Sequence, residues 1–260
     1  MAHRILNVSK QTVFVSSSSS SLSSSSSPSS QTISERIAQL VSGGTVHISS
    51  GEYKENLIVP DNISLIGNGI VKINGDITFV TTNVIIKGNI ISGIEFNNLT
   101  LNKSRLTCRE CTLNEINLSN DSFLDARDCF INKITGEDSN FIIFNSSITQ
   151  EGKTESDHCI KMRNLGNEIK GSSIQNCSLK GHTITEGKTA IEIRNCTVLS
   201  ESVNYAFMIT DPSTLQLFNS TVNTPDFIKN GTGTSIRNGV IAIGIGSMFG
   251  GGENIVYNNV

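Results

Sequence analysis

The sequence contains no tryptophan, only four prolines and no excess of positive charge, with a formal net charge of −3. A charge balance of this sign provides no basic field for a nucleic-acid partner. The most apolar stretch, residues 240–249, is too short and too rich in glycine for a membrane-spanning helix. Residues 1–15 lack the long apolar core of a secretory signal. We therefore predict no nucleic-acid partner, no membrane span and no secretory signal.

The six cysteines do not form the spacing of a metal site or of an extracellular disulfide framework. A structural zinc site needs Cys-x-x-Cys pairs with partners elsewhere in the chain. Cys108 and Cys111 have the right gap, but the repeat described below places a corner between them. We predict free buried thiols, no metal and no cofactor. Reduced thiols suit an intracellular folding site.

A short repeated unit runs along most of the chain, and its clearest copy is Ile191–Val198. Ile191 and Ile193 share one face of a strand, whereas the next inward positions are Cys196 and Val198. Because alternate residues of an uninterrupted strand share a face, the change of parity at Asn195 requires a bend there. Asparagine suits the bend because it tolerates left-handed backbone angles. The unit therefore predicts strand, one-residue corner, strand.

The template has eight successive positions: apolar, any, apolar, any, corner, small, any and apolar. It recurs with a mean interval of about 21 residues, which is typical of a solenoid. Its corners fall at Gly67, Gly88, Glu110, Asp128, Asn145, Asn176, Asn195, Asn219 and Asn238. Its last apolar position is filled by Ile70, Ile91, Leu113, Ile131, Ile148, Leu179, Val198, Val222 and Ile241. Four cysteines, at 111, 129, 177 and 196, follow corners and are expected to stack inside the bend. An out-of-phase match from Ile94 to Leu101 is predicted to lie in another wall of the same coil.

The repeat predicts one elongated all-β domain over residues 32–241, preceded and followed by segments of different composition. Residues 1–15 form an N-terminal arm with an alternating patch at 12–15, and residues 16–31 form a serine-rich linker. The arm either docks elsewhere, for example on a neighbouring subunit, or is a disordered tail. Residues 32–42 carry an apolar helical face and are predicted to cap the first coil, while residues 242–260 form a glycine-rich tail.

The opening of the predicted domain resembles a known superfamily. The apolar helical face is followed by Gly43-Gly44, a short strand, Gly51-Glu52-Tyr53-Lys54-Glu55-Asn56 and Leu65-Ile66-Gly67-Asn68-Gly69. Over residues 32–69 this order is similar to the first coils of the pectin lyase-like superfamily, and in particular to its pectinesterase-like members. The resemblance implies a single-stranded right-handed parallel β-helix, here of about nine or more coils with an N-terminal amphipathic capping helix.

The same resemblance implies catalytic aspartates and an arginine on successive coils, but the sequence does not supply a complete set. The string nearest to the pectinesterase pattern is Asp226-Phe227-Ile228, close to the end of the chain. A hydrolase would need clustered carboxylates, and the nearest set, Asp121, Asp125 and Asp128, lacks the neighbours of the family's motifs. No acidic calcium cluster of a lyase is found. We therefore assign no catalytic residue.

Two polar groupings are candidates for binding a ligand. Asp157, His158, Lys161 and Arg163 lie in the long interval at residues 150–171, where acid, imidazole and cations could bind an anionic sugar or belong to a solvated loop. Arg109, Arg127 and Arg194 each precede a corner and are predicted to line up on the outside of the coil. This alignment would serve either as a stripe for an anionic ligand or as paired surface charge.

Strong repetition without a catalytic set favours a non-enzymatic structural or interaction protein, a component of a larger assembly such as a viral capsid, spike or fibre. Its predicted partners are other protein subunits, contacted through the arm and the tail, and its predicted location is a virion or the cytoplasm. The alternative is a polysaccharide-binding or polysaccharide-processing protein of pectinesterase, lyase or hydrolase type. Its carbohydrate partner would bind in a groove beside the 150–171 loop.

Overall fold

The structure of the protein is a computed structural model. It describes residues 11–15, 31–40, 42–80, 88–150, 158–200, 205–210, 212–224, 226–228, 234–238, 241–243 and 254–257. The predicted serine-rich linker, apart from its last residue, and most of the predicted C-terminal tail therefore lie outside the described residues. So do Val41 and Asp157.

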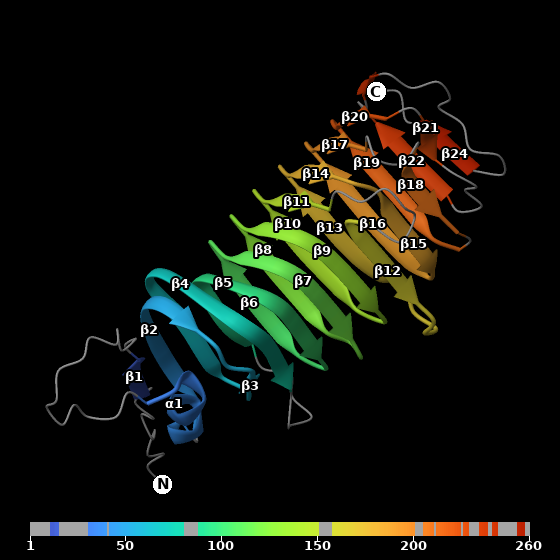
Figure 1. Ribbon diagram of the computed structural model, residues 1–260. Helices are drawn as coiled ribbons and strands as arrows, with labels where there is room; N and C mark the ends of the chain where they lie inside the picture. The colour runs from blue at the N-terminus through green and yellow to red at the C-terminus, as the bar shows by residue number, and fades with distance from the viewer. Residues whose placement is uncertain are drawn as a thin grey trace, which may run out of the picture.

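The described chain winds into a coil with three walls, and every strand pairing is parallel (Figure 1). We name the walls sheets A, B and C in the order in which the chain meets them. Sheet A contains β1 (Gln11–Val15), the first parts of β2 (Gly44–Tyr53), β4 (Ile63–Val80) and β5 (Gly88–Asn102), then β6 (Arg105–Arg109), β8 (Phe123–Arg127), β10 (Asn140–Phe144), β13 (Lys170–Gln175), β16 (Thr189–Arg194), β19 (Thr214–Phe218), β22 (Thr234–Asn238) and β24 (Asn254–Tyr257).

The other two walls follow the same order. Sheet B continues through β2, β4 and β5 into the first parts of β7 (Thr112–Ser119) and β9 (Phe130–Glu137), then β11 (Ser147–Thr149), β14 (Ser178–Lys180), β17 (Thr197–Leu199), β20 (Thr221–Asn223) and β23 (Ile241–Ile243). Sheet C contains β3 (Leu57–Val59), the last parts of β4, β5, β7 and β9, then β12 (Ile160–Asn164), β15 (Thr183–Gly187), β18 (Tyr205–Ile209) and β21 (Asp226–Ile228). The predicted parallel β-helix is confirmed.

The corner between sheets A and B is where the sequence prediction was sharpest. Six predicted corners have a positive φ, between 47° and 55°: Glu110, Asp128, Asn145, Asn176, Asn195 and Asn219. The left-handed conformation turns the chain within one residue, and it reverses the parity of the inward positions on either side. The out-of-phase match is also confirmed, because Ile94 and Phe96 lie in sheet B whereas Leu99 and Leu101 lie in sheet C.

The first two predicted corners were wrong. Ile70, placed at an inward position by the template, is 86% exposed. In β4 the segment between Ile66 and Val71 lies opposite a much shorter stretch of β5, so the chain bulges there and Val71 takes the inward position. Gly88 lies within sheet A, paired with Arg105, and the corner of its coil is Gly93, with a φ of 66°. Glycines and apolar residues are dense in these coils, so the template matched them in the wrong phase.

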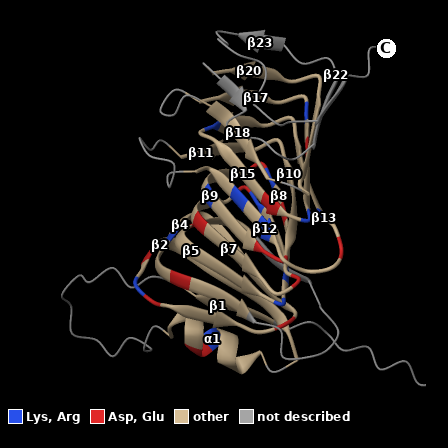
Figure 2. Cartoon of the chain, turned by 90° about the vertical axis from the view of Figure 1, so that its right-hand side faces the viewer, with Lys and Arg blue, Asp and Glu red and all other residues tan. Residues whose placement is uncertain are grey.

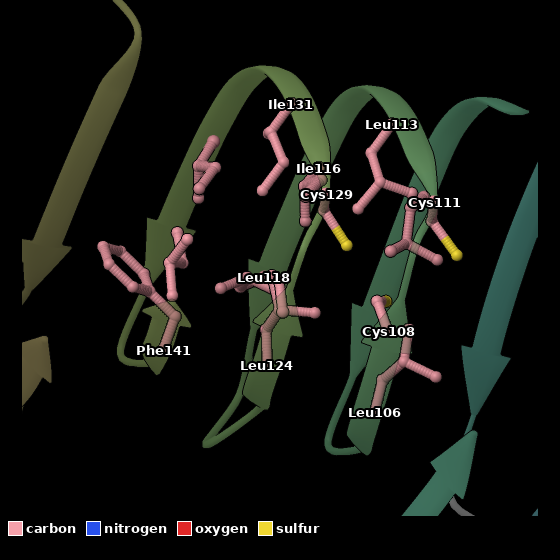
Figure 3. Packing of buried hydrophobic residues seen from close by; sticks show 14 of the residues in the cluster. Leu106, Cys108, Cys111, Leu113, Ile116, Leu118, Leu124, Cys129, Ile131 and Phe141 are labelled. Atoms are coloured by element: carbon pink, nitrogen blue, oxygen red, sulfur yellow. The ribbon is translucent and has the colours of Figure 1, made fainter. Parts of the chain in front are cut away.

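Side chains that follow the A–B corners form a ladder inside the bend. Cys111 and Cys129 occupy the same point of successive coils (Figure 3). The backbone N–H of Cys129 donates to Ser146 Oγ at 3.0 Å, that of Ser146 to Cys177 Sγ at 3.4 Å, and that of Cys177 to Cys196 Sγ at 3.4 Å. The N–H of Cys196 in turn donates to Ser220 Oγ at 3.1 Å. Each coil thus satisfies a buried donor of the coil before it, which explains why small residues with a hydroxyl or a thiol fill this position. All six cysteines are free and buried, as predicted.

The N-terminal end of the coil is covered by two elements of the same chain. Helix α1 (Ile33–Gln39) is capped at its N-terminus by Thr32, which forms a capping box with Glu35, and it packs against β1, β2 and β3. Its apolar face joins the core through Ile33 and Ile37. Strand β1 pairs in register with β2 of its own chain and buries Val15. A contact of this arm with a neighbouring subunit stays a prediction. Among the described residues, no helix is both long and apolar enough to cross a membrane.

Candidate functional site on sheet C

The candidate site is built on β12, which directly follows the long interval in the repeat. Ile160, Met162 and Asn164 are 0–2% exposed and face the core. Because side chains alternate along a strand, Lys161 and Arg163 face outward. The core positions force this orientation, and the two cations therefore stand side by side on the outer face of sheet C.

Glu186 on β15 holds both cations. Lys161 Nζ lies 3.4 Å from Glu186 Oε1, and Arg163 Nε lies 3.7 Å from Glu186 Oε2. Arg163 pairs in register with Glu186 on one side and with Glu137 of β9 on the other. Two steps between parallel strands place the backbones of these glutamates about 10 Å apart, with Arg163 between them. Figure 2 shows positive and negative segments close together on this side of the coil.

His158 packs beside a second histidine rather than beside the two cations. Its ring lies 6.3 Å from that of His182, which in turn lies 5.1 Å from the ring of Tyr205. His158, His182 and Tyr205 are each at most 8% exposed. Sequence reasoning missed His182 and Tyr205, which lie in later coils and gain their proximity only from the stacking of β12, β15 and β18.

The outer face of sheet C is enclosed near this ring cluster. Thr183 and Thr185 pair with Ile160 and Met162 at core positions, so Ile184 lies at an outward position. Ile184 is nevertheless only 6% exposed. Burial raises the pKa of the neighbouring Cys159 thiol to about 12. The thiol is therefore protonated at neutral pH and is a poor nucleophile.

The predicted cluster is thus only partly assembled. The structure joins Lys161 and Arg163 through Glu186, it places His158 in the adjacent ring cluster, and Asp157 lies outside the described residues. Among the described residues, no group of three or more histidine, cysteine or acidic side chains is arranged to hold a metal ion. A role of these residues in ligand binding stays a prediction.

The three aspartates considered for hydrolysis are separated. Asp121 lies at the corner before sheet A and pairs with Lys170, with 2.5 Å between its Oδ1 and Nζ. Asp125 lies on the outer face of β8 and pairs with Arg127, and Asp128 is the A–B corner itself. They form no common site.

No protein-family model matches the sequence, and no curated protein matches it. Among solved structures, the chain is similar to the enzymatically active domain of tailspike protein 4 of bacteriophage CBA120, with a TM-score of 0.51 and 13% identity over 82% of this chain and 41% of that chain. It is also similar to the catalytic domain of a GH87 alpha-1,3-glucanase in complex with tetrasaccharides, with a TM-score of 0.51 and 12% identity over 90% of this chain and 67% of that chain. The pectin methylesterase from Aspergillus niger aligns with a TM-score of 0.48 and 13% identity over 100% of this chain and 94% of that chain.

The likenesses to the tailspike domain and to the glucanase domain show the fold. The chain has a right-handed parallel β-helix fold, as the resemblance of its first coils implied. It spans less than half of the tailspike chain to which it is similar.

Proposed function

We propose that this chain is a polysaccharide-binding β-helix that serves within a larger assembly, and that the outer face of sheet C around Lys161, Arg163 and Glu186 contacts the sugar. The observation that carries the proposal is the convergence of both cations on one carboxylate on the outer face of sheet C. Charged groups held in place by one another provide oriented polar contacts for a hydroxyl-rich ligand.

The comparisons support this proposal over a purely structural role. One similar structure is a glucanase domain bound to tetrasaccharides, and another is the enzymatically active domain of a viral tailspike. A tailspike-like setting also accommodates the predicted location in a virion and the predicted contacts with other subunits.

The test compares two lysines that each form an ion pair on an outer face. Lys161→Gln is expected to weaken binding of a neutral glucan oligosaccharide by about tenfold, the equivalent of roughly 1.4 kcal/mol. Lys72→Gln is the matched control, because Lys72 pairs with Glu95 at 2.9 Å on sheet B. Titration calorimetry over a panel of oligosaccharides measures both. Equal weakening by the two variants, or no binding of any oligosaccharide, contradicts the proposal.

A second candidate is glycoside hydrolysis at the same face. Glu137 and Glu186 flank Arg163 two coils apart, and a backbone spacing of about 10 Å allows carboxyl groups to lie within the roughly 6.5–9.5 Å used by inverting enzymes. Incubation with polysaccharides and analysis of reducing ends decides between the two candidates. If Glu137→Gln and Glu186→Gln each abolish cleavage while Glu95→Gln does not, the chain is an enzyme; no cleavage by the unaltered protein leaves binding alone.

A further inference from the structure

The ladder inside the A–B bend contains two places where cysteines occupy neighbouring coils. Cys111 is followed one coil later by Cys129 (Figure 3), and Cys177 is followed one coil later by Cys196. In both pairs the two thiols are hydrogen-bonded to each other. Cys177 and Cys196 are the more exposed pair, at 5% and 3% against 1% and 2% for the other. A small solute therefore reaches the Cys177–Cys196 pair more readily.

Packing alone does not explain why sulfur occupies both positions of this pair. The ladder runs Ser146, Cys177, Cys196 and Ser220, and each member accepts the backbone N–H of the coil before it. The serine hydroxyls accept at 3.0 and 3.1 Å, whereas the thiols accept at 3.4 Å. The structural role thus needs only a small acceptor, and a hydroxyl is the stronger one. Two sulfur atoms on adjacent coils add the capacity to bond covalently to each other.

The backbone holds the two cysteines at a separation that a disulfide can span. Strands β13 and β16 pair in register directly before the corner, and β14 and β17 pair in register directly after it. Cys177 and Cys196 therefore stand one strand spacing apart, with about 4.8 Å between their Cα atoms. Disulfides join Cα atoms that are roughly 4.4–6.8 Å apart. Closing the bond requires rotation of a side chain rather than movement of a coil.

The two sulfur atoms point in the same direction along the ladder, so one of them must turn. The Cys196 sulfur already lies between the two coils, because it accepts the N–H of Cys177. The Cys177 sulfur faces the preceding coil, where it accepts the N–H of Ser146. Cys177 is therefore the side chain that rotates, and its rotation takes the acceptor away from the Ser146 amide.

The two thiols also differ in reactivity. The hydrogen bond from the Cys177 thiol lowers the pKa of the Cys196 thiol, and burial opposes this effect. The same hydrogen bond, together with burial, raises the pKa of the Cys177 thiol. Because the thiolate is the form that attacks an oxidant, Cys196 is the nucleophile of the pair and Cys177 is the thiol that completes the disulfide.

We propose that Cys177 and Cys196 form a redox-active dithiol, which a peroxide converts into a disulfide between consecutive coils. The Cys196 thiolate attacks one peroxide oxygen and the O–O bond breaks, which leaves a sulfenic acid on Cys196 and a hydroxide that takes up the proton lost by Cys196. The Cys177 thiol then attacks that sulfur, and the sulfenic oxygen leaves as a second water with the Cys177 proton. Two electrons pass from the thiols to the peroxide, and the new bond closes one full turn of the coil.

The experiment treats the full, folded chain with hydrogen peroxide, unfolds it, blocks the remaining thiols with iodoacetamide and digests it with trypsin. Trypsin cuts between the two cysteines, at Lys180, Lys188 and Arg194. Mass spectrometry is expected to find the two cysteine peptides linked, about 2 Da below the sum of their free-thiol masses, and separated again by dithiothreitol. Cys159 is the internal control and is expected to stay free, because its sulfur contacts the oxygen atoms of His182 and Thr183.

Cys177→Ser and Cys196→Ser are matched variants, because serine fills the same ladder position at residues 146 and 220. The coil is therefore expected to stay folded in both, which circular dichroism checks, and neither variant forms the linked peptides. In Cys177→Ser the reaction stops at the sulfenic acid of Cys196, which dimedone labels. In Cys196→Ser the Cys177 thiol is expected to stay unlabelled.

Hydrogen exchange reports the rotation of Cys177 independently of the chemical link. In the oxidised chain the Ser146 amide is expected to exchange about tenfold faster than in the reduced chain, because its acceptor has turned away. Four outcomes overturn the inference: no linked peptides from the folded chain, a link that forms only in urea, equal dimedone labelling of the two variants, or unchanged exchange of the Ser146 amide on oxidation.

Discussion

Ser146 provides the strictest test of how the corners are held together. Its hydroxyl accepts the buried backbone N–H of Cys129 at 3.0 Å and donates to the carbonyl of Phe144 at 2.8 Å. In Ser146→Ala the Phe144 carbonyl keeps a donor, because the N–H of Asp128 reaches it at 3.1 Å. The N–H of Ser146 itself still donates to Cys177 Sγ. The substitution therefore orphans one group, the N–H of Cys129.

Leaving one buried donor unsatisfied costs about 1–3 kcal/mol, so Ser146→Ala should lower the free energy of unfolding by that amount. Ser146→Cys should recover most of the loss, because the thiols of Cys177 and Cys196 already accept the same bond in neighbouring coils. Ser147→Ala is the matched control; that hydroxyl is only partly buried and contacts Thr149 Oγ1 at 3.3 Å.

Urea unfolding measures the change, and hydrogen exchange of the Cys129 amide locates it. Exchange is needed as well because a coil of stacked repeats can open in parts. If Ser146→Ala matches Ser147→Ala in stability and leaves the Cys129 amide equally protected, the ladder does not stabilise the corner as argued.

Three further predictions concern a corner, a buried thiol and the first strand. Asn195 has a φ of 53°, so Asn195→Ala should cost about 1–2 kcal/mol and Asn195→Gly much less; urea midpoints that rank the two the other way would contradict the left-handed corner. Because the pKa of Cys159 is raised to about 12 in the folded chain and an unfolded thiol titrates near 8.5, stability from this group is complete below about pH 8 and is lost as the pH rises towards 12. Cys159→Ala should show a shallower loss of stability over that range, and an unchanged slope would refute the assignment. Val15 is 2% exposed, so Val15→Asp should detach β1 and speed proteolytic removal of the N-terminal segment, while cleavage at the rate of the unaltered chain would show that β1 is not held by β2.

The sequence predicted the fold best at the corners where a single residue turns the chain between two strands. From Glu110 to Asn219 a single left-handed residue separates two strands, so the parity of apolar positions reports the corner directly. At Gly67 the chain bulges over several residues, and a Cβ there would lie 2.3 Å from the carbonyl oxygen of Gly93. That glycine is required by the close approach of two coils, which a pattern of apolar residues does not record.

The candidate site was predictable only along one strand. Alternation on β12 places Lys161 and Arg163 on the same face, which is a local property of the sequence. Glu186 reaches the two cations, and His182 reaches His158, only because β15 stacks on β12 in this register. Proximity across coils depends on coil length, and single-sequence reasoning has no direct measure of it.

The ladder inside the bend also has a direction. At the corner after sheet A, a side chain of the following coil accepts the backbone N–H of Cys129, Ser146, Cys177 and Cys196. At the corner before sheet A the direction is the same: the N–H of Ser104 donates to Ser122 Oγ, and the N–H of Ser122 donates to Ser139 Oγ. During synthesis, each newly made coil must therefore wait for its successor before its turns are fully bonded. The same rule makes the coil a unit that gene duplication can add or remove whole, since a coil inserted anywhere in the ladder accepts from the one behind and donates to the one ahead.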